Sequence, residues 1–265
     1  FQTAYPEAQR VLDFEGLQLI ELEPGAQIRK SGRWHTMSDP QRRPLKAWAT
    51  LTNRIGGWND RWALLKLRSR LKKSSIEELL LAPEDTTTLC YLREQVGFSD
   101  DFIESFVRPW LAGIFLENDL ETSSNYFKFV FKMLSEASVC LPKGGMGQIP
   151  TQMASRIEPA KIKLNSPLDR VGLESVRLKD GREVLAPVVV MAAGMPSDLL
   201  TDQELSSEGW NGTTCIYFSA KRPPSQEKSL MLNGEGQGAV NHVFIQSNSD
   251  PSLSPDDRAL ISVSL

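Results

Sequence analysis

Cysteine and histidine are scarce in this sequence, which has three cysteines and two histidines among 265 residues. The cysteines, Cys90, Cys140 and Cys215, lie far apart, and none belongs to a CxxC pair. Such spacing argues against a disulfide framework and structural zinc, and it is typical of a reducing compartment such as the cytoplasm. His35 and His242 are too few to predict any other metal site.

Long apolar runs and an excess of one charge are also missing. No segment of about 18 apolar residues occurs, so none is expected to span a bilayer, and no signal peptide is visible. The 30 basic and 33 acidic residues give a net charge of −3. This balance provides no reason to expect nucleic acid as a partner. The densest basic run, residues 66–73, alternates with leucine and predicts the solvated face of a helix.

Motifs for nucleophilic or metal-assisted catalysis are absent as well. The sequence contains neither GxSxG nor HExxH. Its acidic pair, Glu117 and Asp119, lies in a loop-like segment where we expect both side chains to be solvated. The catalytic residues are therefore unknown from sequence, and an enzyme with this sequence would depend on a cofactor for its chemistry.

The order of the elements that are present indicates the fold class. Alternating apolar residues predict strands over residues 17–23 and 26–37, with a Pro-Gly turn between them. A block of helices follows, and strands return over residues 213–220, 239–246 and 259–265. Strands, then helices, then strands predict an α+β fold in which a mixed sheet carries a helical insertion.

Start and stop signals divide the helical block. Apolar residues spaced for one helix face begin after Asp60. Pro109 is expected to bend or end the helix in which it lies, because proline lacks a backbone donor. Other helix starts and ends are marked by capping side chains and by glycine. The predicted caps are Ser74 or Ser75, Thr87 or Thr88, Ser99, and Thr122 or Ser123, with helix ends near Gly97 and Glu136.

The second half of the chain carries a hairpin signal and a buried-strand signal. Asp180-Gly181 between two alternating runs predicts a β-hairpin. Residues 188–194 form a short, continuously apolar run, which predicts a strand buried on both faces of a parallel sheet. A helix over residues 148–157 is expected before both.

The most unusual stretch is CLPKGGMGQIP at residues 140–150, which places three glycines in four positions. A phosphate-binding loop, a packing turn and one fragment of a larger cofactor site are the alternatives. The lysine precedes the glycines, so the P-loop pattern is absent, and proline replaces the third small residue of GxGxxG. A structural turn around Gly144 and Gly145 is the interpretation that these residues favour by themselves.

Eight aromatic residues gather within residues 102–131. Partners four residues apart are typical of a helical core, and the same residues can also form the wall of a cavity for an apolar ligand. Both interpretations stay open. The residues that we assign to such a substrate pocket are Phe106, Trp110, Phe127, Phe131, Gly144 and Gly145.

Four segments together resemble a known family. They are FQTAYPEAQRVLD, SFVRPWLAGIFLENDLETSSNYFKFVFKML, LPKGGMGQIP, and the hairpin followed by VVMAAGMP. In this order they resemble the FAD-dependent flavin amine oxidase and phytoene desaturase superfamily, and the resemblance covers nearly the whole chain. It implies an α+β (α/β) fold: a substrate-binding domain with a mixed β-sheet and a helical insertion, plus part of a Rossmann-like FAD-binding domain.

The resemblance also implies a domain organisation. Residues 1–140 would form the substrate-binding region, residues 141–200 would return to the FAD-binding domain, and residues 201–265 would add strands to the substrate domain. The family's N-terminal unit with GxGxxG is not in this sequence. We therefore expect the chain to be a piece of a longer protein that binds FAD when intact, and to bind FAD poorly by itself.

Site residues follow from the same resemblance. Leu168 matches the family residue whose backbone meets the FAD adenine, and Ala192, Ala193 and Gly194 match a strand end that passes close to the dinucleotide. The lysine that amine oxidases place near the flavin has no counterpart near Cys215.

The missing lysine makes the family's desaturase-like branch the closer match. The implied function is oxidation of a hydrophobic substrate, with isoprenoids among the candidates, by hydride transfer to flavin. The alternative is a carrier that binds a lipophilic ligand without redox chemistry. Peripheral membrane contact is also open, because the aromatic helix with Pro109 is suited to a bilayer surface as well as to a core.

Overall fold

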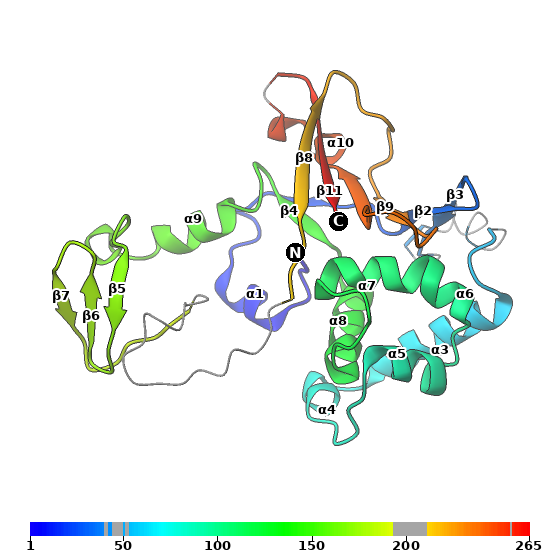
Figure 1. Ribbon diagram of the computed structural model, residues 1–265, viewed down its shortest axis with the longest axis horizontal. Coiled ribbons are helices and arrows are strands. Elements are labelled where there is room, and N and C mark those ends of the chain that lie inside the picture. Colours follow the sequence, from blue (N-terminus) through cyan, green and yellow to red (C-terminus); the bar gives the residue numbers. More distant parts are fainter. Residues whose placement is uncertain (40–41, 44–49, 51–52, 193–210, 255) are drawn as a thin grey trace. The chain divides into compact units, whose positions relative to one another are not determined.

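The computed structural model describes residues 1–39, 42–43, 50, 53–192, 211–254 and 256–265 (Figure 1). The chain divides into two compact units. The first unit contains residues 1–153 and 211–265, and the second contains residues 154–210. Each unit is described by itself.

The first unit is built on a six-stranded mixed sheet, with the strand order β3-β2-β9-β10-β11-β8. Strands β2 and β9 pair in parallel, and all other neighbours pair antiparallel. Since β2 and β3 precede the helices and the other four strands follow them, the predicted α+β fold with a helical insertion is confirmed. The strands are β2 (Ala26–Lys30), β3 (Arg33–Met37), β8 (Cys215–Ala220), β9 (Leu230–Asn233), β10 (His242–Ile245) and β11 (Ala259–Ser264).

A separate two-stranded sheet uses β1 (Leu19–Glu21), which was expected before the Pro-Gly turn. It pairs antiparallel with β4 (Cys140–Pro142), a strand that the sequence patterns did not predict. A short helix, α1 (Pro6–Val11), precedes β1, and α9 (Gln148–Ser155) follows β4 after the glycine cluster.

Four helices of the insertion begin where the capping signals predict. Ser75, Thr87, Ser99 and Ser123 each accept a hydrogen bond from the backbone N–H three residues later, which satisfies one of the free donors at a helix start. The helices are α3 (Trp58–Lys73), α4 (Ile76–Leu80), α5 (Thr88–Cys90), α6 (Asp100–Phe102), α7 (Arg108–Phe115) and α8 (Ser124–Glu136), with π-helical stretches η1 (Tyr91–Val96) and η2 (Ile103–Val107).

Pro109 does not end its helix, contrary to one of the two expected outcomes. Helical residues run without a break from α6 through η2 and α7. At the end of η2 the Arg108 N–H donates to the Ile103 carbonyl, five residues back. The missing N–H of Pro109 therefore falls where the hydrogen-bond pattern changes register, which makes proline tolerable there.

The main core lies between one face of the sheet and the helical insertion. Ile28 on β2 and Leu232 on β9 are buried in the same cluster as the helical aromatics. The other face of the sheet has a smaller core of Ile245, Ala259 and Ile261. The largest fully buried side chains of the helical part include Tyr91, Leu92, Phe102, Ile103, Leu111, Leu120 and Phe127.

The second unit contains a three-stranded antiparallel sheet of β5 (Leu168–Val171), β6 (Ser175–Leu178) and β7 (Glu183–Leu185). The turn between β6 and β7 carries Gly181 at φ +87°, a conformation that glycine adopts readily. The predicted hairpin at Asp180-Gly181 is therefore confirmed.

The strand predicted over residues 188–194 is not found in its described part. Residues 188–192 form no strand, and Val188 and Val190 are 72% and 81% exposed. A strand buried on both faces needs a neighbour on each edge, and no described segment pairs with this run. Residues 193 and 194 lie outside the described residues.

Candidate functional site

A cavity of about 420 Å³ lies in the first unit between the sheet and the helices. Its walls come from strands of the six-stranded sheet, from the helices η2, α7 and α8, and from connecting segments that carry Glu23, Asp39, Arg42 and Lys228. The lining residues include Ala26, Leu230, His242, Phe244 and Ser262 from the sheet, and Phe106, Trp110 and Leu134 from the helices.

The sheet wall follows from the alternation of side chains along a strand. His242 and Phe244 on β10 line the cavity, whereas Val243 and Ile245 belong to the core on the opposite face. Ser262 on β11 pairs with Phe244, and its hydroxyl donates to the Phe244 carbonyl at 3.2 Å. The wall is apolar except at its histidine and serine.

The helix wall is aromatic. Phe106 and Trp110 are four residues apart on one helix face, and their rings are stacked with centroids 5.6 Å apart and planes at 4°. Trp110 meets Phe131 of α8 edge-on at 6.2 Å. Such ring pairs prefer offset or edge-to-face geometry, so they give this wall a defined shape.

A second cavity of about 250 Å³ shares Phe106, Trp110 and Leu134 with the first, and Phe131 and Leu65 also line it. Its surface is mostly apolar, but Ser38, Thr50, Arg61 and one ionic network at the end of α8 also line it. The two cavities are therefore neighbours along the same aromatic wall, which suits an elongated apolar ligand.

The ionic network holds the C-terminus of α8. Arg68 contacts both carboxylate oxygens of Asp39 at 2.9 and 3.0 Å, and Arg42 lies 3.7 Å from the same group. Arg42 donates to the Ala137 carbonyl at 2.9 Å, and Arg68 donates to the Ser135 carbonyl at 3.2 Å. Cations at this helix end complement its free carbonyl groups, so the network is a structural brace beside the cavities.

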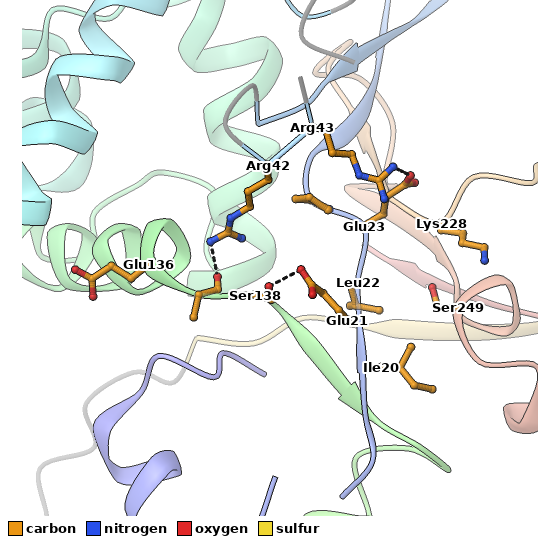
Figure 2. A pocket seen from close by; sticks show the side chains of 12 residues that line it. Ile20, Glu21, Leu22, Glu23, Arg42, Arg43, Glu136, Ser138, Lys228 and Ser249 are labelled. Atoms are coloured by element: carbon orange, nitrogen blue, oxygen red, sulfur yellow. Dashed lines mark hydrogen bonds and ion pairs between the residues drawn. The ribbon is translucent and has the colours of Figure 1, made fainter. Parts of the chain in front are cut away.

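A third cavity, of about 720 Å³, is lined by several charged side chains (Figure 2). It meets the first cavity at Leu22, Glu23, Pro24, Arg42 and Lys228, which line both. Its charges are partly paired within the protein: Arg43 contacts Glu23, and Ser138 donates to Glu21 (Figure 2). A charged cavity therefore adjoins the aromatic wall of the first cavity.

His242 is the titratable side chain on the sheet wall of the first cavity. Burial lowers the pKa of His242 below its ordinary value of 6.5, so the ring is neutral at pH 7. Asn241 Nδ2 donates to His242 Nδ1 at 3.1 Å, which leaves the ring proton on Nε2. Gly113 of α7 packs against the ring, and a Cβ at this glycine would lie 2.8 Å from it. The arrangement gives a rigid, uncharged histidine.

His242 should make stability depend on pH. Above about pH 6.5 the ring is neutral in both the folded and the unfolded chain, and its full contribution is present. As the pH falls from 6.5 through the lowered pKa, the unfolded chain takes up a proton that folded His242 resists, so the free energy of unfolding should fall. Urea unfolding at about pH 7.5 and about pH 5.5 measures this slope. The slope should be smaller in His242→Gln than in the wild type; equal slopes in the two proteins would contradict the assignment.

The glycine cluster forms a closed turn. Gly144 and Gly145 have φ of +80° and +97°, and the Gly144 N–H donates to a carboxylate oxygen of Asp250 at 3.1 Å. Burial opposes ionisation of Asp250, but the hydrogen bonds from Ser252 and Gly144 outweigh it and leave its pKa below the ordinary value. The Gly144 N–H therefore already donates to a carboxylate of the protein itself. The turn therefore does not fit a phosphate group, and the structural interpretation is the better one.

The structure brings some of the assigned pocket residues together. Phe106, Trp110 and Phe131 line the second cavity. Phe127 is fully buried between Tyr91 and Phe131, and it is not among the lining residues of the cavities described here. Gly144 and Gly145 lie in the closed turn, and they too are not among these lining residues.

The residues assigned to the cofactor lie in the second unit. Leu168 begins β5 and is half-buried, and Ala192 is exposed. Ala193 and Gly194 lie outside the described residues.

The sequence interpretation missed the sheet side of the pocket. The missed residues are Leu230, His242, Phe244 and Ser262 from the sheet, with Leu134 from α8. A polar residue in an otherwise apolar strand, as His242 is in His242-Val-Phe-Ile, is the signal that could have found part of this wall.

Glu117 is a structural anchor, and the expectation that it is solvated is wrong. It is half-buried, and its carboxylate accepts hydrogen bonds from the Leu120 N–H at 2.7 Å and from the Thr122 hydroxyl at 2.9 Å. It closes the loop before α8, since one carboxylate can accept hydrogen bonds from several turn donors at once. Asp119 is exposed, as expected.

Two absences hold for the described part of the chain. Its histidine, cysteine and carboxylate side chains form no group that could hold a metal ion. None of its helices is long and apolar enough to cross a membrane.

The fold has solved counterparts. An oxidoreductase from Methanosarcina mazei superimposes with a TM-score of 0.67 at 16% identity, and a protein from Pyrococcus furiosus superimposes with a TM-score of 0.65 at 14% identity. Each match covers 93% of this chain and 60% of the other chain. The chain thus spans less than two thirds of the length of these structures. No curated protein matches it.

These matches show that the chain shares its fold with solved structures, an oxidoreductase among them. The family follows from sequence: all of residues 1–265 match the flavin-containing amine oxidoreductase model. The chain belongs to this family.

Proposed function

We propose that the chain supplies the substrate-binding part of an FAD-dependent oxidoreductase that oxidises a hydrophobic substrate such as an isoprenoid. One observation carries the proposal: two neighbouring cavities with a shared aromatic wall lie between the sheet and the helices of a flavin-family fold. Apolar walls with few polar groups are typical of sites for lipophilic ligands.

The lining residues account for binding and orientation. Phe106 and Trp110 offer a flat stacked surface to an extended hydrocarbon, and Leu134 closes both cavities from α8. The neutral ring of His242 adds a polar group without a charge to the sheet wall. Flavin, when bound, supplies a two-electron acceptor for hydride, so the protein needs no acid–base pair of its own.

The cofactor contacts belong to the same proposal. The glycine turn at Gly144 does not fit the diphosphate of FAD. We therefore retain Leu168 and the small residues Ala192, Ala193 and Gly194 as the residues whose backbone approaches the dinucleotide, because small side chains allow such an approach.

Filling the cavity tests this function. Leu134→Trp should raise the substrate concentration needed for half-maximal flavin reduction by about tenfold or more, since losing about 1.4 kcal/mol of binding is tenfold. The protein from the complete gene would be mixed anaerobically with a panel of prenyl lipids, and flavin absorbance would be followed. Leu80→Trp, at a 43% exposed position on α4, is the matched control.

The outcomes separate the alternatives. Unchanged concentration dependence in Leu134→Trp would contradict the location of the site. Prenyl-lipid binding that Leu134→Trp abolishes, without any reduction of flavin, would favour the non-catalytic carrier instead.

A further inference from the structure

Helix α3 exposes an apolar stripe to solvent. Trp58 and Trp62 are 63% and 62% exposed, and Leu65 is 46% exposed. At positions i, i+4 and i+7 they lie on one side of the helix. The opposite side, which carries Leu67 and Leu71, is buried in the main core. Exposed large apolar side chains in a contiguous row mark an interaction surface.

The same side of α3 is basic toward its C-terminus. Lys66, Lys72 and Lys73 are exposed and continue the stripe. None of the three ammonium groups has a recorded ion pair with a described residue. The one acidic residue of α3, Asp60, is buried on the other side. We call the six residues Trp58, Trp62, Leu65, Lys66, Lys72 and Lys73 the outward face of α3.

This face borders the second cavity. Leu65 belongs both to the outward face and to the cavity lining, to which Arg61, Leu64 and Arg68 of the same helix also contribute. An apolar cavity thus has one of its wall residues on the exposed aromatic stripe.

We propose that the outward face of α3 docks onto the surface of an anionic lipid bilayer. Indole rings prefer the boundary between headgroups and acyl chains. Lysines beside them are attracted to an anionic leaflet. The acidic residues nearest along the chain, Glu77 and Glu78 of α4, are exposed beyond the end of α3 and oppose this attraction only in part. Attraction must be local, because the chain as a whole carries a net charge of −3.

Docking would set the rim of the second cavity against the lipid. This position would give a hydrophobic substrate a route from the bilayer to the cavity that avoids water. That consequence rests on the proposed function. Docking itself does not rest on it, since vesicle binding is measured without flavin or substrate.

Vesicle co-sedimentation tests the proposal. The protein should partition onto phosphatidylcholine vesicles that contain phosphatidylserine, more weakly onto phosphatidylcholine alone, and less at high salt. Replacing Lys66, Lys72 and Lys73 together by Gln should lower partitioning onto the anionic vesicles about 100-fold. Trp58→Ala with Trp62→Ala should lower it about tenfold or more, because binding scales with buried apolar area. Trp34→Ala, at a 48% exposed position on β3, should leave it unchanged.

Fluorescence locates the contact. Brominated lipids should quench the wild-type tryptophan emission, and Trp58→Phe with Trp62→Phe should bind but lose that quenching. Lysine and tryptophan variants that partition onto anionic vesicles as strongly as the wild type would overturn the proposal. The proposal would also be overturned if the wild-type protein does not bind vesicles and is a dimer that becomes a monomer when Trp58 and Trp62 are replaced. The outward face of α3 would then be a protein interface.

Discussion

Asp60→Ala is expected to lower the free energy of unfolding by about 3–4 kcal/mol. Asp60 is 2% exposed and joins two helix starts. Its carboxylate accepts hydrogen bonds from the Gly57 N–H at 2.7 Å, the Ser99 N–H at 2.7 Å and the Ser99 hydroxyl at 2.8 Å. Removing it takes away the buried acceptor that these three donors share at the beginning of both α3 and α6.

Urea unfolding followed by circular dichroism measures this loss, and three variants control it. Asp60→Asn keeps the shape and should cost less than Asp60→Ala. Asp119→Ala, at an exposed loop position, should be nearly neutral. In a double-mutant cycle, Ser99→Ala should add little on top of Asp60→Ala, because the two share one network. A neutral Asp60→Ala would contradict the role of this carboxylate.

Gly234→Ala should cost about 3 kcal/mol or more, because the added methyl group has no space. A Cβ at Gly234 would lie 2.4 Å from the Ser105 carbonyl oxygen and 2.9 Å from the Arg29 carbonyl oxygen. Both obstacles are backbone atoms, which cannot rotate away. Ser105 belongs to η2 and Arg29 to β2, so the clash would separate the helices from the sheet and distort the cavity between them.

Thermal unfolding checks this prediction, with Gly147→Ala as the matched control. A Cβ at Gly147 would meet nothing within 4 Å, so this variant should keep the wild-type midpoint. Prenyl-lipid binding should weaken in Gly234→Ala and stay the same in Gly147→Ala. Equal midpoints for the two variants would contradict the close approach of η2 to the sheet.

The helix starts could be predicted because their signals are local. Ser75, Thr87, Ser99 and Ser123 all cap helices, since a capping side chain and its backbone partner are three residues apart. The hairpin at Gly181 was predictable for the same reason: a turn constrains neighbouring residues only.

Features that depend on distant partners were missed. The pairing of β1 with β4 joins segments that come before and after the helical insertion in the sequence. Neither segment has a local pattern that predicts its pairing partner. Residues 188–192 are apolar but lack a described strand neighbour, so composition predicted a strand that the structure does not form. The aromatic half of the pocket was visible as a cluster, whereas the wall with His242 and Phe244 requires knowledge of which face of β10 meets the helices.

Photocrosslinking tests most directly the claim that an apolar ligand lies between the sheet and the helices. A benzophenone-labelled prenyl alcohol would be irradiated with the protein, and the modified peptides would be mapped by mass spectrometry. We expect labels on the segments with Phe106 and Trp110, Leu134, and His242 to Phe244, and we expect Leu134→Trp to abolish them. Labels confined to other surfaces, or unchanged in that variant, would contradict the account.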